Sequence, residues 1–347
     1  MSAPSVIRTA VLGFGVSGRI FHAPFIAANS EFRLDFITTS NAERIAIAAE
    51  RYPGARILEA SNDVFDHADA LDLVVIGTPP ATHFELAKQA IAAGLHVVVD
   101  KPFVPSSAQA KELIDRAEQA GVTLTVFQNR RWDADFLTLR SVIESGRLGV
   151  IRTFESRFEW WKPQGFRDWK ATATLAEGGG ILYDLGSHLI DQALQLFGPV
   201  ETLTAELRRP ADSSSDADND AFLALRHSSG TISHLHMSGL AALRAPRFHV
   251  LGTKAAYTKW GLDTQEPRLI AGAQPSDADF GVEPREHWGV LGVNDDTELV
   301  EPERGDYGTF YRRLADTLLR KAPLAVDPRQ SLEVLNLIER AHSSSSL

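Results

Sequence analysis

The chain has 347 residues. A single hydrophobic core stops growing at about 250 to 300 residues, so two domains are expected. Its formal net charge is −10, from 45 acidic and 35 basic residues, and a negative surface repels a phosphate backbone, which argues against nucleic acid as a partner. Cysteine is absent, and neither a secretory signal nor an apolar run of membrane-spanning length is seen, so we expect a cytoplasmic protein with no membrane segment.

Short β-branched runs alternate with helical patterns in residues 1–126. The strand-like runs are 9–15, 32–39, 72–78, 96–100 and 122–127, and the helical patterns are 17–28, 42–52, 83–94 and 110–120. Strands that alternate with helices are typical of an α/β fold with a doubly wound parallel sheet. The sequence therefore predicts an N-terminal Rossmann domain over residues 1–126.

Three glycines, Gly13, Gly15 and Gly18, form a G-x-G-x-x-G motif directly after the first strand and at the start of a helix. Glycine permits the tight turn, lets backbone N–H groups approach a pyrophosphate, and lets the helix begin close to the strand. In this βαβ context the motif predicts dinucleotide binding rather than a merely structural turn.

The end of the second strand predicts which dinucleotide binds. An NAD site usually has an acidic residue there, to bond the ribose 2′-hydroxyl, but this chain has Ser40 and Asn41, with Arg44 one turn into the next helix. These side chains can donate hydrogen bonds to a 2′-phosphate, which favours NADP, with NAD as the alternative. Arg44 could also be an ordinary solvated helix charge.

The rhythm changes near residue 127. Period-two alternation marks residues 151–160, 201–208, 221–227, 231–238 and 247–252, after a single helical pattern at 135–145. Such runs predict a largely antiparallel sheet and a second, α+β domain over residues 127–347. We expect residues 212–220 to be a polar hairpin loop without chemistry, 271–287 an irregular loop, and 343–346 a disordered tail.

The stretch EGGGILYDLGSHLIDQ, residues 177–192, places Asp184, His188 and Asp191 at helical spacing. A separate apolar stripe, formed by Leu185, Leu189, Ala193 and Leu196, can pack the helix down, so the three polar side chains are not needed for burial. This pattern predicts that one helix presents a polar face to a substrate.

These motifs, together with GFGVSGRIFHAPFI, GTPPATHFELAKQAIAAGLHVVVDKPF and VFQNRRWDADF, resemble the Gfo/Idh/MocA oxidoreductases over essentially the whole chain. The combinations FHAPFI, NRRWDADFL and LYDLGSHLIDQ are most similar to NADP-dependent scyllo-inositol dehydrogenases. The resemblance implies a Rossmann domain, and a C-terminal domain whose open sheet commonly forms a dimer interface. A homodimer or homotetramer is therefore expected.

The resemblance also implies the site residues. The family's catalytic lysine falls on Lys101, its aspartate and histidine fall on Asp184 and His188, and Asp100 replaces the family's usual Glu. Further candidates for cofactor binding are Phe14, Val16, Ser17, Thr78, Pro79, Asp100 and Lys101, and candidates for substrate binding are Arg131, Trp132, Trp161, Asp184 and His188. Trp160, Arg167 and Trp169 could also stack on or hydrogen-bond a polyhydroxy ring, although clusters of aromatic residues often simply pack.

The residue types fit a hydride transfer between a nicotinamide and a secondary hydroxyl. A lysine at the carboxyl end of a parallel strand can stabilise developing alkoxide charge, and an imidazole titrates near neutral pH and can accept the hydroxyl proton. The sequence predicts an NADP-dependent dehydrogenase of a cyclic polyol or sugar. The alternatives are an aldose or imine reductase of the same family and a non-catalytic, dinucleotide-sensing regulator. No metal is expected, because His234 and His236 have no evident third ligand.

Overall fold

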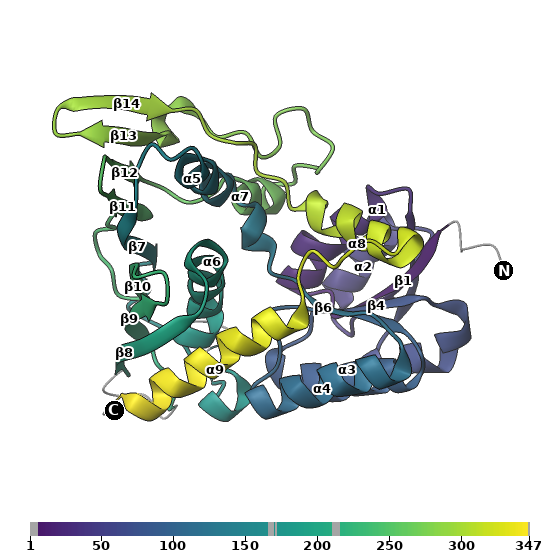
Figure 1. Ribbon diagram of the computed structural model, residues 1–347. Helices are drawn as coiled ribbons and strands as arrows, with labels where there is room; N and C mark the ends of the chain where they lie inside the picture. Colours follow the sequence, from purple (N-terminus) through teal and green to yellow (C-terminus); the bar gives the residue numbers. More distant parts are fainter. Residues whose placement is uncertain (1–5, 166–169, 171, 210–215, 346–347) are drawn as a thin grey trace. The chain divides into compact units, whose positions relative to one another are not determined.

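The computed structural model describes residues 6–165, 170, 172–209 and 216–345 (Figure 1). The chain divides into two compact units. The first comprises residues 1–129, 266–280 and 307–332, and the second comprises 130–265, 281–306 and 333–347. The first unit thus includes two segments of the C-terminal half, whereas the sequence analysis divides the chain once, at residue 127.

The first unit is built on a parallel six-stranded sheet with the order β3-β2-β1-β4-β5-β6. Its strands are β1 (Ile7–Leu12), β2 (Phe32–Thr38), β3 (Arg56–Leu58), β4 (Leu73–Ile76), β5 (His96–Val99) and β6 (Leu124–Val126). All four residues of β4 are buried, as expected of a parallel sheet covered on both faces. The predicted Rossmann-type sheet is confirmed.

Helices of the first unit follow the strands in turn. They are η1 (Ser17–His22), α1 (Ala23–Ala27), α2 (Ala42–Arg51), η2 (Ser61–Ala70), η3 (Pro80–Thr82), α3 (His83–Ala92), α4 (Ser107–Ala120) and, from the C-terminal half, α8 (Gly308–Arg320). Helices α3 and α4 lie side by side (Figure 1). Phe310 of α8 packs edge-on against Phe127 with ring centroids 4.8 Å apart, so α8 completes the core of this unit.

Strand order in the first sheet reverses between β1 and β4. The chain leaves β1 toward β2 and β3 on one side, and then returns to β4, β5 and β6 on the other. In open α/β sheets ligands bind beyond the carboxyl ends of the strands at such a reversal. The glycine turn after β1 and the Gly77–Thr78 turn after β4 therefore mark the binding end of this unit.

The second unit is built on an eight-stranded sheet with the order β14-β13-β12-β11-β7-β10-β9-β8. Its strands are β7 (Ile151–Glu159), β8 (Val200–Arg208), β9 (Asp220–His227), β10 (Ile232–Ser238), β11 (Phe248–Gly252), β12 (Ala256–Lys259), β13 (Gly289–Val293) and β14 (Asp296–Val300). The β7–β10 pair is parallel, and the other pairs are antiparallel. The expected mostly antiparallel sheet of the α+β part is confirmed.

One face of the second sheet carries α6 (Ser187–Phe197), which contacts β7 and β10 (Figure 1). Leu235 and Met237 of β10 are fully buried, whereas His234 and His236 lie on the opposite face and are half-buried. The remaining helices that the second unit contains in whole or part are η4 (Asn129–Trp132), α5 (Ala134–Glu144), η6 (Leu175–Glu177), η7 (Leu182–Gly186), α7 (Gln265–Ile270), η8 (Arg285–His287) and α9 (Pro328–Ser344).

Two local expectations are wrong. Residues Ser343 and Ser344, predicted as part of a disordered tail, form the last turn of α9. Residues 182–186 form a π-helical turn before α6, rather than the start of one regular helix, and residues 17–22 are also π-helical. A π-turn inserts one extra residue per turn, and helical periodicity alone does not show it.

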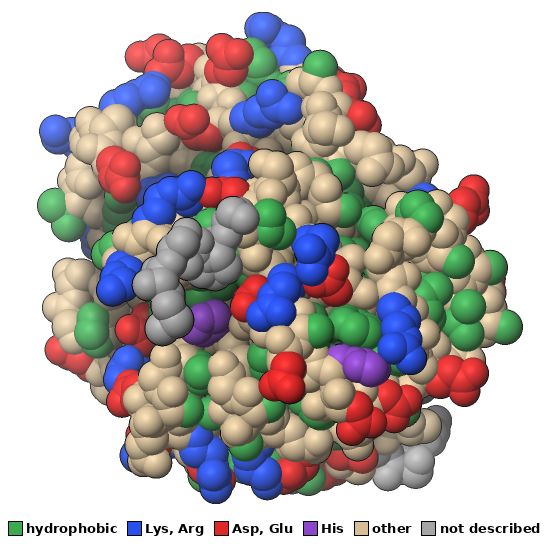
Figure 2. Space-filling view, turned by 90° about the vertical axis from the view of Figure 1, so that its right-hand side faces the viewer, with side chains coloured by type: hydrophobic (Ala, Val, Ile, Leu, Met, Phe, Trp, Pro, Cys, Tyr) green, Lys and Arg blue, Asp and Glu red, His purple; other side chains and the backbone are tan. Residues whose placement is uncertain are grey.

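Charged side chains of both signs are interspersed on the face seen in Figure 2, and the Lys and Arg residues drawn there in colour do not gather into one patch. In the described part of the chain, no helix combines the length and apolarity needed to cross a bilayer.

Candidate active site

The glycine turn after β1 is too close-packed for side chains at two positions. A Cβ at Gly18 would lie 2.0 Å from the Gly13 carbonyl oxygen, and Gly13 has a φ of +86°, in the left-handed region that favours glycine. The Gly13 N–H donates to Thr38 Oγ1 at the end of β2, over 2.9 Å. This turn has a backbone without side chains at these positions and leads into a helix, which fits the pyrophosphate of a dinucleotide.

The Arg44 side chain lies over this turn. One of its guanidinium nitrogens would be 3.7 Å from a Cβ placed on Gly15. Asn41 caps α2 by accepting the Arg44 N–H at 3.0 Å, which fixes the first turn of the helix that carries Arg44. Ser40 and Asn41 are exposed beside it. The three residues predicted to bind a 2′-phosphate are therefore gathered at one end of the sheet.

Lys101 follows β5 at the carboxyl end of the first sheet. Its N–H donates to Asp100 Oδ1 over 2.7 Å. Its bond to Pro102 is cis. The buried His83 ring joins this loop to the preceding one, because Nδ1 lies 3.1 Å from the Pro102 carbonyl oxygen and Nε2 lies 2.8 Å from that of Thr78. His83 thus ties the lysine loop to the Thr78–Pro79 turn.

A second buried histidine lies behind Asp100. His22 shares a hydrogen bond of 2.6 Å with the Tyr311 hydroxyl, and its Nε2 is 3.9 Å from Asp100 Oδ2. Burial lowers the pKa of His22 to about 4, against the opposing effect of Asp100, and burial raises the pKa of Tyr311 well above its usual range. His22 is therefore neutral at neutral pH.

In the second unit, Asp184 lies in the η7 turn and His188 in the first turn of α6. The Lys170 ammonium donates to Asp184 Oδ2 at 2.5 Å, and the Asp184 side chain is 17% exposed. His188 is 3% exposed and meets the Phe158 ring edge-on at 6.1 Å. The structure thus brings the predicted carboxylate and imidazole together on consecutive turns.

The third polar residue of this face, Asp191, is buried and paired. Arg131 donates to both of its oxygens, from Nε over 2.8 Å and from Nη2 over 2.6 Å, and both side chains are less than 10% exposed. A bidentate buried pair fixes geometry firmly. It anchors α6 to the segment that carries Arg131 and Trp132, both predicted to bind substrate.

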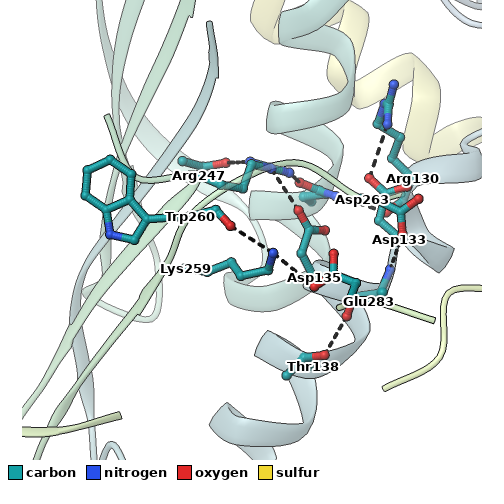
Figure 3. A network of polar contacts seen from close by, with 12 residues as sticks. Arg130, Asp133, Asp135, Thr138, Arg247, Lys259, Trp260, Asp263 and Glu283 are labelled. Carbon is teal, nitrogen blue, oxygen red and sulfur yellow. Dashed lines mark hydrogen bonds and ion pairs between the residues drawn. The ribbon is translucent and has the colours of Figure 1, made fainter. Parts of the chain in front are cut away.

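A network of buried polar contacts includes Asp135, Arg247 and Lys259 (Figure 3). Arg247 donates to Asp135 Oδ2 at 3.2 Å and to Gln192 Oε1 at 2.7 Å, and Gln192 in turn donates to the Arg130 carbonyl oxygen at 3.0 Å. Lys259 pairs with Glu283 at 3.0 Å. The network joins α5, α6 and the strands of the second sheet into one rigid support.

Aromatic residues predicted near the substrate fall into two groups. Trp132 is 8% exposed, whereas Trp161 is 57% exposed and forms an isolated bridge with Leu240. Arg167 and Trp169 lie outside the described residues. Of these aromatic side chains, Trp161 is open to a ligand.

His234 and His236 face Phe222, whose ring centroid is 5.9 and 4.8 Å from theirs. Within the described residues, no group of three or more His, Asp or Glu side chains is arranged to hold a metal ion.

Sequence reasoning missed several supporting residues. Asp216 and Asp218, in the loop expected to carry no chemistry, accept the N–H groups of Leu175 at 2.8 Å and Leu182 at 2.7 Å. The described part of this loop thus supports the segment that precedes Asp184. His83 also contacts the Pro102 carbonyl oxygen, 19 residues away, and Arg247 bonds Asp135, 112 residues away, so no local pattern marks these contacts.

Comparison with known proteins shows which family the chain matches. Residues 7–128 match the model of the oxidoreductase family with an NAD-binding Rossmann fold, and residues 136–258 match the GFO/IDH/MocA C-terminal domain. The chain belongs to the Gfo/Idh/MocA oxidoreductase family. It is 32% identical to scyllo-inositol 2-dehydrogenase (NADP(+)) IolW of Bacillus subtilis, over 98% of this chain and 94% of that protein.

A further relative of this chain and a solved structure extend the comparison. D-glucoside 3-dehydrogenase of Escherichia coli is 28% identical over 56% of this chain and 55% of that protein. The solved structure of the oxidoreductase YvaA from Bacillus subtilis superposes with a TM-score of 0.91 at 31% identity, covering 98% of this chain and 96% of that one. Relatives of this oxidoreductase thus act on polyols and sugars.

Proposed function

We propose that this oxidoreductase is an NADP-dependent dehydrogenase that oxidises, or regenerates, a secondary hydroxyl of a cyclic polyol or sugar of the scyllo-inositol type. The observation that carries the proposal is the presence in one chain of a dinucleotide-type glycine turn, Lys101 at the carboxyl end of β5, and the Asp184–His188 pair. A cofactor-sensing regulator needs the glycine turn but has no use for the other three.

The cofactor is held, in this proposal, by the glycine turn from Gly13 to Gly18, the Thr78–Pro79 turn and the loop of Asp100 and Lys101. Ser40, Asn41 and Arg44 bind the 2′-phosphate, for which the Arg44 guanidinium beside Gly15 supplies the charge. A nicotinamide bound there would supply the acceptor or donor of the hydride. Binding of NAD remains the alternative.

The side chains have separate tasks in the proposed reaction. His188 accepts the hydroxyl proton as the carbonyl forms, because a histidine can exchange a proton near neutral pH. Lys101 donates a hydrogen bond to the reacting oxygen and stabilises its negative charge. Asp184 orients the imidazole or bonds a neighbouring hydroxyl. Arg131, Trp132 and Trp161 shape the pocket for the ring.

We further propose a homodimer or homotetramer built on the second sheet. On the face opposite α6, His234, His236 and Phe222 are half-buried, and Leu251 and Val290 are 37% and 36% exposed. An open sheet face with apolar residues is a typical self-association surface.

The test is a panel of inositols, pyranoses and their keto forms, assayed with NADP and NAD through nicotinamide absorbance. We expect turnover with at least one cyclic polyol or sugar, at higher kcat/KM with NADP. Activity on imines or open-chain aldoses alone would favour the alternative reductase. Tight cofactor binding with no turnover on any substrate would favour the regulator.

A further inference from the structure

The start of the turn that carries Asp184 is held by the backbone and side chain of Asp218, which lies 36 residues after Leu182 in the chain. The Asp218 carbonyl oxygen accepts the Ile181 N–H at 2.8 Å, and its Oδ2 accepts the Leu182 N–H at 2.7 Å. The Asp218 side chain is 1% exposed. Two consecutive amides shortly before Asp184 are therefore fixed by one buried residue.

Gly180 allows this close approach. A Cβ at Gly180 would lie 2.5 Å from Asp218 Oδ1, and its φ of +99° lies in the region that disfavours side chains. The third glycine of the GGG run is therefore required so that the Asp218 carboxylate can reach the start of the turn.

His342 of α9 holds the other oxygen of the same carboxylate. Its Nε2 is 3.1 Å from Asp218 Oδ1, and its Nδ1 is 3.0 Å from the Ile338 carbonyl oxygen. The His342 ring also stacks on Tyr183, with centroids 5.6 Å apart and an interplanar angle of 20°. Leu182 and Tyr183, which directly precede Asp184, are thus held by Asp218 and His342 respectively.

We propose that Asp218 and His342 are positioning residues for Asp184 and His188. This inference rests on the proposed function, in which those two side chains act on the substrate. A π-turn is a rare insertion in a helix and is frequent at functional sites, and here the two amides at its start bond to Asp218 rather than to the helix itself. Small displacements of a reacting group slow catalysis strongly, by as much as about 10²-fold for about 1 Å.

The central variant is His342→Phe, which keeps a ring to stack on Tyr183 but has no nitrogen to bond Asp218. His342→Gln supplies an amide donor at a similar reach and is the rescue variant. Asp218→Ala removes both carboxylate oxygens, so the Leu182 N–H loses its acceptor and His342 Nε2 loses its partner. Ser343→Ala is the matched control, because Ser343 is exposed on α9 and bonds the Glu339 carbonyl oxygen.

Two readouts are combined. Amide hydrogen exchange of the peptide covering residues 181–186, measured without substrate, should be about tenfold faster in His342→Phe and Asp218→Ala, and unchanged in His342→Gln and Ser343→Ala. With substrate, kcat should fall about tenfold in the first two variants, while KM and NADP affinity change little, and His342→Gln should retain most of the activity.

The two readouts separate this inference from the proposed function. Unchanged exchange in both His342→Phe and Asp218→Ala overturns the positioning role, whether or not the enzyme turns over any polyol. Faster exchange with undiminished kcat overturns it as well. If the unmodified protein turns over no substrate of the panel, the proposed function fails while the exchange measurement still decides whether these residues hold the turn.

Discussion

Lys101 lies at the carboxyl end of β5, next to Asp100, whose side chain accepts the Lys101 backbone N–H. In the proposed mechanism it stabilises charge that develops only during the reaction, so its contribution appears in turnover rather than in binding. We expect Lys101→Ala to lower kcat far more than it raises the dissociation constant of NADP.

The arginine variant of the same residue is the control. Lys101→Arg keeps the charge, but its broader guanidinium displaces the reacting carbon, so it should not restore turnover. Steady-state kinetics and cofactor titration measure both effects. Near-normal turnover in either variant would rule out the role assigned to Lys101.

Arg44 determines the choice of cofactor in this proposal. Arg44→Ala should weaken NADP binding by about 1 to 3 kcal/mol, the scale of a hydrogen bond to a charged group, and leave NAD binding nearly unchanged. Fluorescence titrations with the two cofactors measure the difference. Equal losses for NADP and NAD would refute a 2′-phosphate contact.

Single residues were predictable from sequence where a local motif marks them. The glycine turn and Arg44 lie at the expected end of the first sheet, because βαβ order fixes which loops share that end. Asp218 and His342 were not predictable, since their partners lie 36 and 124 residues away. Asp191, on the predicted polar face of the helix, pairs with Arg131, which lies 60 residues away in the chain.

At the scale of elements, alternation of apolar residues predicted both sheets. It did not predict the π-turn at residues 182–186 or the last turn of α9, where serines continue a helix whose Ala341 is buried. Tertiary contacts rather than local propensity determine both. The buried network of Arg247 and Lys259 is likewise formed by side chains from several elements.

This network makes a prediction for stability. Burial raises the pKa of Glu283 to about 7 and that of Asp263 to about 6, although Lys259 lowers the pKa of Glu283 in part. Between the ordinary glutamate pKa and about 7, the folded state therefore binds more protons than the unfolded state. Stability from Glu283 is present at low pH and decreases as pH rises toward 7.

Glu283→Gln removes this titration. As pH increases from about 5 to about 7, the unfolding free energy of the unmodified protein should fall relative to that of the variant. The expected fall is about 1.4 kcal/mol for each unit by which the pKa is raised. Thermal unfolding of both proteins across that range measures it, with the exposed Glu286→Gln as control. A difference that does not vary with pH would contradict a raised pKa.

At the scale of the whole molecule, the open face of the second sheet predicts self-association. Light scattering over a dilution series should give at least twice the mass of the 38.0 kDa chain. Phe222→Glu places a charge among His234 and His236 and should shift the protein toward the monomer. A persistent monomer of the unmodified chain would exclude an oligomer built on this face.

In the proposed mechanism His188 accepts the hydroxyl proton during polyol oxidation, and the pH–rate profile of His188→Asn is the decisive test of this role. In the unmodified enzyme, oxidation should fall as pH drops through an ionisation in the histidine range. We expect the variant to bind NADP and fold normally, to turn over roughly 10²- to 10⁴-fold more slowly, and to lack that acidic limb, because asparagine does not titrate. If His188→Asn kept both its rate and the acidic limb, another group, such as Lys101, would have to be the base.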